Sequence, residues 1–177
     1  DCLPHYFNEF DMFCRRTRTF LSTARRHALL AGSPVLPVPV LYAGSMPTST
    51  RQLWQLLRHS LAKSRTWREA FETAVARERL PLALCWQQTD KSDLAEGLYL
   101  KVEDDEQVLA RYKLVRPDFT QTILDSGSHH ATRPLIPNRL APGVDLYAPQ
   151  PLVTWESLGL RTCRSPDELA QLTRSTR

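Results

Sequence analysis

The fold is decided by the stretch Glu96-Gly-Leu-Tyr-Leu-Lys-Val-Glu-Asp-Asp-Glu-Gln-Val-Leu-Ala-Arg-Tyr-Lys-Leu-Val115. Two runs of residues that favour β-structure flank a short acidic segment, Asp104-Asp105-Glu106. Such runs on both sides of a polar turn predict an antiparallel β-hairpin.

The predicted hairpin gathers charged side chains on one face. Arg111 and Lys113 share a face because side chains alternate along a strand, while Glu96 begins the adjacent strand and Lys101 lies near its far end. Cations placed in this way can hold a polyphosphate, and a carboxylate can position an attacking group or a metal-bound water. The alternative is a solvated hairpin whose cations make only cross-strand ion pairs.

Upstream of the hairpin, two further strands are expected. Alternation in residues 6–13 indicates a strand that ends at the basic turn Arg15-Arg-Thr-Arg18. A second strand is indicated for residues 35–42, at a sheet edge because it contains Pro37 and Pro39.

Capping residues and the spacing of apolar residues predict helices around these strands. The proline-rich residues 134–151 are expected to be irregular. The expected helices are one from the cap Ser22 to Leu30, stopped by Gly32; one capped within residues 48–50 and carrying Leu53, Trp54, Leu57 and Leu61; one carrying Trp67, Phe71 and Val75; and a short one over residues 166–172.

Length and composition set the bounds. A chain of 177 residues, 42% hydrophobic and 24% charged, is large enough to bury a core, so one domain or most of one is expected. No apolar run approaches the ~18 residues of a membrane span, and the start lacks the regions of a signal peptide. Because the chain starts at Asp1 with a strand-forming segment close behind, we expect it to begin inside a longer protein.

Charge and cysteine content narrow the class further. A net charge of +4 and a pI near 9.0 suit a polyanion-binding protein, although an arginine-rich coding bias produces the same balance. No glycine-rich phosphate loop of the GxxxxGK[ST] type is present. His129-His130 has no third ligand at a recognisable spacing, so no metal ligand is assigned. Widely spaced cysteines indicate free thiols in a reducing cytoplasm, namely Cys2, Cys14, Cys85 and Cys163.

Three segments in order resemble known motifs. Glu96-Gly-Leu-Tyr-Leu-Lys101 resembles motif IV of the covalent nucleotidyltransferases, EGhhhK with h apolar, and Arg111-Tyr-Lys113 resembles their motif V. Tyr6-Phe-Asn-Glu-Phe-Asp11 resembles motif IIIa of the RNA ligase 2-type group. The chain therefore resembles the ATP-dependent RNA ligase family over most of its length. Bacterial members of that family are also similar in the segments Leu3-Pro-His-Tyr-Phe7, Phe20-Leu-Ser-Thr-Ala-Arg-Arg26, Lys113-Leu-Val-Arg-Pro-Asp-Phe-Thr-Gln121 and Arg133-Pro-Leu-Ile-Pro-Asn-Arg-Leu140.

The resemblance implies an α+β fold of the covalent nucleotidyltransferase type, which is ATP-grasp-like, with antiparallel sheets flanked by helices and the nucleotide in a cleft between them. It assigns residues 1–125 to the C-terminal part of that domain, with the N-terminal portion missing. Residues 126–177 would be a proline-rich extension packed on the same domain. The implied activity joins RNA 5′-phosphate and 3′-hydroxyl ends through enzyme-AMP and RNA-adenylate intermediates, with ATP as cosubstrate and Mg²⁺ as cofactor.

The resemblance also implies a role for each matching residue. Phe10 would stack on the adenine, although a core phenylalanine is the alternative. Glu96 would act through the ribose or a metal-bound water, and Lys101 would support the nucleotide from the same strand. Lys113 would contact the α-phosphate and stabilise the transition state. Arg111 stands where lysine is usual in the group, so the charge is kept but not the small ammonium.

The family's nucleophile is not found. The KxDG or KxxG motif that supplies the AMP-modified lysine, the following arginine motif and the Gly-Glu pair of motif III do not occur before Phe10. Lys91-Ser-Asp93 lacks the glycine and lies just ahead of motif IV, so it is rejected. We expect the lysine upstream of Asp1 or on a separate chain that supplies the missing half, and no activity of this chain alone.

A basic cluster is expected to contact the RNA strand through its phosphates. A solvated turn and helix face is the alternative. The expected partners are RNA ends and ATP, and no membrane. The residues of the cluster are Arg15, Arg16, Arg25 and Arg26, with Arg18 beside them.

Two other classes stay open. A non-catalytic nucleotide- or RNA-binding protein on the same fold would keep Glu96, Lys101 and Lys113 without the nucleophile, whereas a structural domain with decayed motifs would not need them. A lysine motif encoded upstream of Asp1 favours the ligase, and a start codon at or near Asp1 favours the binding protein.

Overall fold

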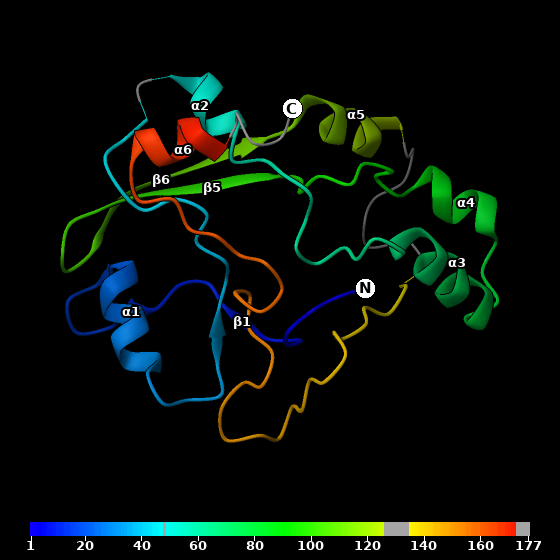
Figure 1. Cartoon of the computed structure of the whole chain (residues 1–177), viewed down its shortest axis with the longest axis horizontal. Coiled ribbons are helices and arrows are strands. Elements are labelled where there is room, and N and C mark those ends of the chain that lie inside the picture. Colours follow the sequence, from blue (N-terminus) through cyan, green and yellow to red (C-terminus); the bar gives the residue numbers. More distant parts are fainter. Residues whose placement is uncertain (48, 126–134, 173–177) are drawn as a thin grey trace.

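The computed structural model describes residues 1–47, 49–125 and 135–172, with short helices and two-stranded sheets arranged as an α+β protein (Figure 1). The α+β class expected from the sequence is thereby confirmed. His129 and His130, to which the sequence assigned no metal, fall in residues 126–134 and therefore lie outside the described residues.

The β5–β6 hairpin is the longest strand pair in the described ranges and confirms the prediction. Strands β5 (Gly97–Glu103) and β6 (Val108–Val115) pair antiparallel. At the turn, Asp104 Oδ1 accepts the backbone N–H of Gln107 at 2.7 Å and of Glu106 at 2.8 Å. These two bonds, the one from Gln107 first, lower the pKa of the Asp104 carboxyl because they stabilise its charged form.

One face of the hairpin enters the core. Leu98 is buried, and Leu100 and Leu114 pack against the same cluster. The glycine of the EGhhhK segment is explained here, because a Cβ on Gly97 would clash with the carbonyl oxygen of Leu114. Since side chains alternate, the apolar face fixes which residues point the other way. The rest of this core cluster is Leu53, Leu56 and Leu169, with Leu41, Tyr42 and Leu57 against it.

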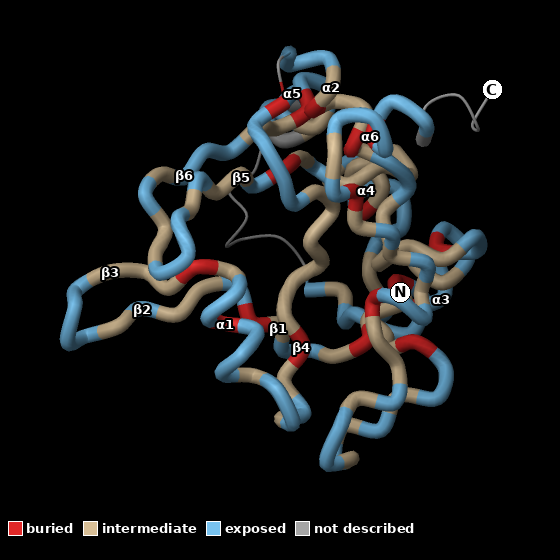
Figure 2. The backbone as a smooth tube through the Cα atoms, turned by 60° about the vertical axis from the view of Figure 1, so that its left-hand side comes forward, coloured by how far each residue is buried: buried red, intermediate tan, exposed pale blue. Residues whose placement is uncertain are grey.

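The strand expected over residues 6–13 is divided in two. Strand β1 (Asn8–Glu9) ends before Phe10, and β2 (Phe13–Cys14) pairs antiparallel with β3 (Thr19–Phe20). The division was missed because the alternation of polar and apolar residues continues through the break. Figure 2 shows β2 and β3 projecting from the body, and we call residues 13–20 the finger.

Helix α1 (Thr23–Leu30) begins and ends where the sequence predicted. Ser22 Oγ accepts the backbone N–H of Arg25, as an N-cap does, and Gly32 has a φ of 77°, which glycine adopts without strain. The cap residue also reaches the hairpin, because its Oγ donates to the carbonyl oxygen of Asp105 at 2.8 Å. The helix start is therefore tied to the β5–β6 turn.

The strand expected over residues 35–42 is shorter than predicted and parallel. Strand β4 (Leu36–Pro37) pairs parallel with β1, whereas the other two strand pairs are antiparallel as expected. Pro37 and Pro39 supply no backbone N–H, which limits the ladder to a short edge pairing. Trp155 Nε1 donates to the Pro37 carbonyl at 3.0 Å and covers it.

The predicted helices form with one shortened. Helix α2 (Thr50–Trp54) has a capping box at Ser49 but stops before Leu57 and Leu61, whereas α3 (Trp67–Arg77) and α6 (Pro166–Leu172) agree with prediction. Two helices were missed, α4 (Leu82–Gln87) and α5 (Pro117–Asp125). Each starts next to a proline, which suits the first turn of a helix.

Residues 135–165 contain no helix or strand, and the part of the predicted irregular segment 134–151 that is described, 135–151, is irregular as expected. This region joins the rest of the chain through isolated bridges. Leu140 bridges to Leu3, and Cys163 bridges to Tyr42. Among the described residues, no helix is long and apolar enough to cross a membrane.

Candidate nucleotide site

The polar face of the hairpin brings four of the predicted residues into two neighbouring groups. The register places Tyr99 opposite Lys113 and Lys101 opposite Arg111, all on the side away from Leu98 and Leu114. Lys113 Nζ lies 2.8 Å from Glu96 Oε1, and both side chains are about half exposed, at 59% and 49%. We call Lys113 and Glu96 the open pair.

The second group centres on an aspartate. Asp11 Oδ1 lies 2.7 Å from Lys101 Nζ, and its Oδ2 lies 3.4 Å from Arg111. The side chains of Asp11 and Lys101 are each only 12% exposed, whereas Arg111 is 38% exposed. Lys101, predicted to support the nucleotide, and Arg111 thus share one enclosed carboxylate, so Lys101 is held in place more firmly than Lys113.

Phe10 lies over the second group and stays accessible. Its ring meets Tyr99 edge-on at a centroid distance of 4.7 Å, and Lys101 Nζ lies 4.9 Å from its centroid. The side chain is 40% exposed, so the predicted stacking residue is not a buried core phenylalanine. An aromatic ring beside fixed cations can bind a base through its face and the attached phosphates through charge.

Arg26 differs from the expectation that it contacts RNA. It is 2% exposed and pairs with Glu9, which is 6% exposed. Its NH1 also donates to the carbonyl oxygen of Phe10 at 2.8 Å, and its NH2 donates to Thr23 Oγ1 at 3.2 Å. A buried guanidinium does not reach a surface where RNA binds, so Arg26 instead fixes the backbone on which Phe10 stands. We call Glu9 and Arg26 the buried pair.

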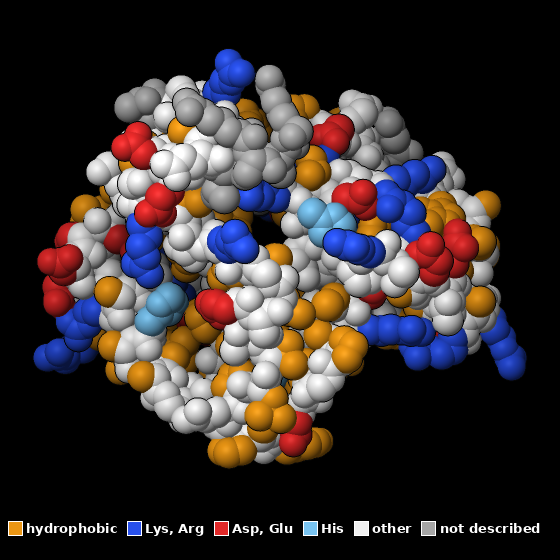
Figure 3. Space-filling model, viewed as in Figure 1, with side chains coloured by type: hydrophobic (Ala, Val, Ile, Leu, Met, Phe, Trp, Pro, Cys, Tyr) orange, Lys and Arg blue, Asp and Glu red, His pale blue; other side chains and the backbone are white. Residues whose placement is uncertain are grey.

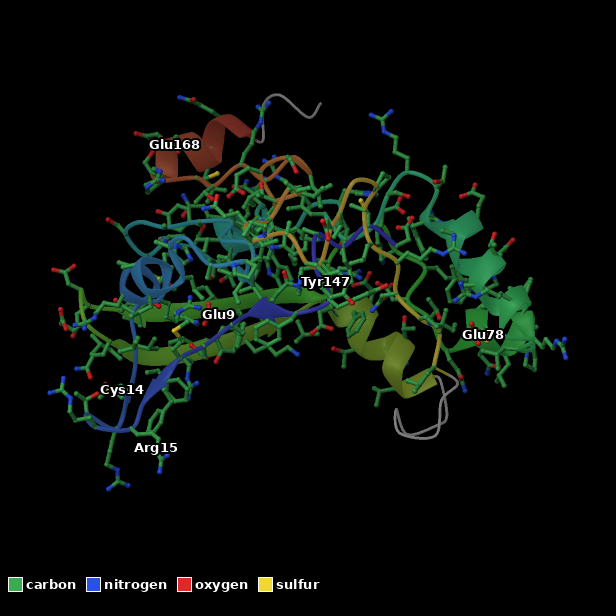
Figure 4. All side chains as sticks on the ribbon, turned by 90° about the horizontal axis from the view of Figure 1, so that it is seen from below. Glu9, Cys14, Arg15, Glu78, Tyr147 and Glu168 are labelled. Carbon is green, nitrogen blue, oxygen red and sulfur yellow. The ribbon has the colours of Figure 1, made fainter. Side chains whose placement is uncertain are left out.

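The other three arginines that were predicted to contact RNA are exposed. They lie in two separate regions, helix α1 and the finger. Arg25 is half exposed and pairs with Glu106 at the hairpin turn. Arg15 and Arg16 lie on the finger, and Figure 4 shows Arg15 at its end, away from Glu9. The finger is joined to the site because the guanidinium of Arg111 lies 4.1 Å from the ring centroid of Phe20.

Arg116 is a buried residue that fixes the backbone next to the open pair. This residue is 3% exposed, donates from Nε to the Ala95 carbonyl at 2.7 Å and pairs with Asp90 at 2.7 Å. Its backbone N–H donates to the Glu96 carbonyl at 2.9 Å. Arg116 therefore fixes the backbone at Glu96 through its own N–H, while its buried guanidinium holds the neighbouring residues Ala95 and Asp90.

The carboxylates of the site suit a magnesium ion only in part. In the described ranges, no three His, Cys, Asp or Glu side chains converge as a metal cluster would. Asp11 already serves two cations, whereas Glu96 is half exposed and its Oε1 alone meets Lys113. Mg²⁺ commonly binds through one or two carboxylates together with substrate phosphates, and Glu96 fits that mode.

Sequence reasoning missed Asp11, Glu9 and Arg116 as members of the site. Asp11 stands inside the segment that resembles motif IIIa, and its position next to Phe10 is the feature that could have identified it. The partners of Glu9 and Arg116 are distant in sequence, so only the fold identifies them.

Comparison with known proteins places these residues in one family. A family model described as RNA ligase matches residues 1–115, which is more than half of the chain and includes Phe10, Glu96 and Lys113. No curated protein and no solved structure matches the chain.

Proposed function

The chain belongs to the RNA ligase family, and from that premise we propose that it forms the nucleotide-binding wall of an ATP-dependent RNA ligase. The observation that carries the proposal is the polar face of the β5–β6 hairpin, which presents Lys113, Glu96, Lys101 and Arg111 beside the exposed ring of Phe10. The proposed fold is that of the covalent nucleotidyltransferases.

Lys113 has the most direct role in this proposal. It is a half-exposed cation whose single partner among the described residues is the equally exposed Glu96. An exposed ion pair contributes little stability, so exchanging the carboxylate for the α-phosphate of ATP costs little. The ammonium then stabilises the negative charge that grows on the phosphate as the leaving group departs.

Phe10, Lys101 and Arg111 would orient the nucleotide. The adenine stacks on the open face of Phe10, while Lys101 stays bound to Asp11 and supplies a fixed positive charge beside it. Arg111, which is more exposed than Lys101, is free to turn toward the phosphates. Mg²⁺, when bound through Glu96 and the phosphates, supplies charge neutralisation.

The complete reaction has three steps in the proposal. A lysine attacks the α-phosphorus of ATP and releases pyrophosphate, AMP passes from that lysine to an RNA 5′-phosphate, and a 3′-hydroxyl attacks that phosphate and releases AMP. None of the four lysines of the chain starts a KxDG or KxxG motif. The proposal therefore assigns the first attack to a lysine outside these 177 residues.

Binding of radiolabelled ATP with Mg²⁺, measured by equilibrium dialysis, tests this function. We expect the chain to bind ATP and Lys113→Ala to bind it about tenfold or more weakly, because a charge-assisted contact is lost. Lys91→Ala is the matched control, since Lys91 is exposed and lies outside the hairpin, with its carbonyl bonded to Arg68 of α3. Equal affinity of Lys113→Ala and Lys91→Ala would contradict the proposal.

The same samples also test where the nucleophile is. After denaturing electrophoresis, we expect no covalently labelled band, because the lysine motif is absent. A labelled band that persists in Lys91→Ala would show that another lysine of this chain is the nucleophile.

A non-catalytic nucleotide- or RNA-binding protein on the same fold is the second candidate. It is supported by the same contacts, because Phe10, Lys101 and Lys113 would serve nucleotide binding without catalysis. Joining the chain to a family segment that carries the lysine distinguishes the two, since only a ligase would then seal RNA ends.

A further inference from the structure

The finger carries an unbalanced positive charge at its end. Arg15, Arg16 and Arg18 are exposed, and within the described part of the chain none of them forms an ion pair. No Asp or Glu occurs between Met12 and Ser22. By contrast, Arg25, only one helix turn past the finger, pairs with Glu106.

The sides of the finger are aromatic. Phe13 and Phe20 are paired across β2 and β3, with their rings edge-on at 5.1 Å, and Phe13 is 51% exposed. Phe20 is half-buried, whereas Phe13 is exposed, so the ring of Phe13 is the one that remains available to another molecule. Arg111 stacks on Phe20, which makes the finger continuous with the nucleotide site.

The face of the molecule drawn in Figure 3 carries both signs of charge. On the face drawn in Figure 3, many Lys and Arg side chains lie among Asp and Glu, and a group of Lys and Arg lies together at the lower right. The finger concentrates three cations within four residues, in a chain whose net charge is only +4.

We propose that the finger binds single-stranded RNA, with Arg15, Arg16 and Arg18 on its phosphates and Phe13 on an unpaired base. Single strands are the nucleic acids whose bases are free to stack on aromatic side chains, while arginines follow the backbone. The proposal rests on the ligase function for the identity of the polymer as RNA, since the site beside the finger would hold the end to be joined.

The arrangement favours RNA over other anionic surfaces. A finger that enters a lipid surface needs apolar residues at its end and cations behind them, and here that order is reversed. An acidic peptide would use the arginines but would leave the exposed ring of Phe13 without a partner.

Fluorescence anisotropy with a labelled 12-nucleotide single-stranded RNA, without ATP, tests the proposal. We compare the chain with Arg15→Ala/Arg16→Ala and with the control Arg65→Ala/Arg77→Ala, which removes the same charge from exposed positions at α3. At ~0.1 M salt we expect the finger variant to bind about tenfold more weakly than the control. Its slope of log K against log salt should fall by about 1.4, because each contact to a single strand contributes about 0.7.

Phe13→Leu separates stacking from charge. This variant should bind about fivefold more weakly with an unchanged salt slope, because base stacking does not release counterions. A duplex of the same sequence should bind more weakly than the single strand, and vesicles with anionic lipid should not compete. Equal binding of duplex, competition by vesicles, or equal affinity of the finger variant and the control would overturn the proposal.

Cys14 gives an independent measure on the unaltered protein. Hydrogen bonds from the Thr17 side chain, and then from the backbone at Thr17 and Arg16, lower the pKa of the Cys14 thiol to about 7. The thiolate therefore forms near neutral pH and reacts with iodoacetamide. Saturating RNA should slow this alkylation at least fivefold, as followed by mass spectrometry with Cys2 as the reference thiol. Unchanged alkylation at saturating RNA would contradict the proposal.

The outcome is separable from that of the proposed ligase function. Lys113→Ala should lose ATP binding and keep RNA binding, and Arg15→Ala/Arg16→Ala should do the opposite. Loss of RNA binding in the finger variant with no ATP binding by any variant would support the finger and contradict the nucleotide site.

Discussion

Two ion pairs of the same chemistry stand in opposite surroundings. The buried pair, Glu9 and Arg26, is 6% and 2% exposed, whereas the open pair, Glu96 and Lys113, is 49% and 59% exposed. The first is bonded further to the backbone of Phe10 and to Thr23. In the second, Lys113 meets only Glu96 among the described residues.

The difference in exposure indicates different roles: the buried pair stabilises the structure around the site, and the open pair binds the ligand. Taking charges out of water is costly, and the cost is offset only while both partners and their hydrogen bonds are in place, so the buried pair fixes one geometry. The open pair is screened by water and salt, so its lysine can change partner at little cost. We therefore expect the open pair to contact ATP, and we expect substitutions in the buried pair to destabilise the fold.

Arg26→Ala should give the largest effect. Removing the guanidinium leaves the Glu9 carboxylate buried without its partner, which typically costs about 3–5 kcal/mol of unfolding free energy. Urea denaturation measures this loss. The adjacent Arg25→Ala is the matched control, because Arg25 and Glu106 are exposed and such pairs contribute about 0–1 kcal/mol.

Replacing both partners of the buried pair sharpens the same test. Glu9→Leu/Arg26→Met removes both charges and should recover most of the stability that Arg26→Ala loses. The hydrogen bond to the Phe10 carbonyl would still be absent, so ATP affinity should stay below that of the unaltered chain. Equal stability of Arg25→Ala and Arg26→Ala would refute the contrast between the two pairs.

Asp11→Asn should have the next largest effect on stability. The carboxylate bonds to Lys101 in an enclosed setting, so its loss should lower the unfolding free energy by about 1.5–3 kcal/mol, the range for hydrogen bonds to charged groups. Glu96→Gln is the control and should cost about 0–1 kcal/mol because its partner is exposed. If the two variants lost equal stability, enclosure of Asp11 would not distinguish the groups.

Features of the fold could be predicted from the sequence where the interacting residues are close together along the chain. The β5–β6 hairpin, α1 and α3 depend on local alternation, caps and spacing, and all three formed as expected. The placing of Lys101 opposite Arg111 also follows from this one hairpin, whereas Glu96 precedes β5 and its contact with Lys113 does not follow from alternation.

The remaining features depend on contacts across the chain. Arg26 was assigned to a surface because it stands in a run of basic residues, but Glu9, 17 positions earlier, holds it in the interior. Asp11 meets Lys101 and Arg111 from 90 and 100 positions away. Helical spacing also overestimated α2, since Leu57 joins the core after the helix has ended.

The finger also predicts the smallest effect, and with the opposite sign. Arg18 has a φ of 58°, a left-handed conformation that costs a residue with a Cβ about 1–2 kcal/mol and glycine nothing. Glycine loses more entropy on folding, so Arg18→Gly should gain a net ~0.5 kcal/mol in urea denaturation. Arg18→Ala keeps the Cβ and removes the same charge, so its unfolding free energy should not increase.

Arg15→Gly is the control at a position without a positive φ, and it should instead lose up to about 1 kcal/mol of unfolding free energy. A loss in Arg18→Gly as large as that in Arg15→Gly would mean that the finger's end is not strained. A gain would show that the backbone at Arg18 disfavours a residue with a Cβ.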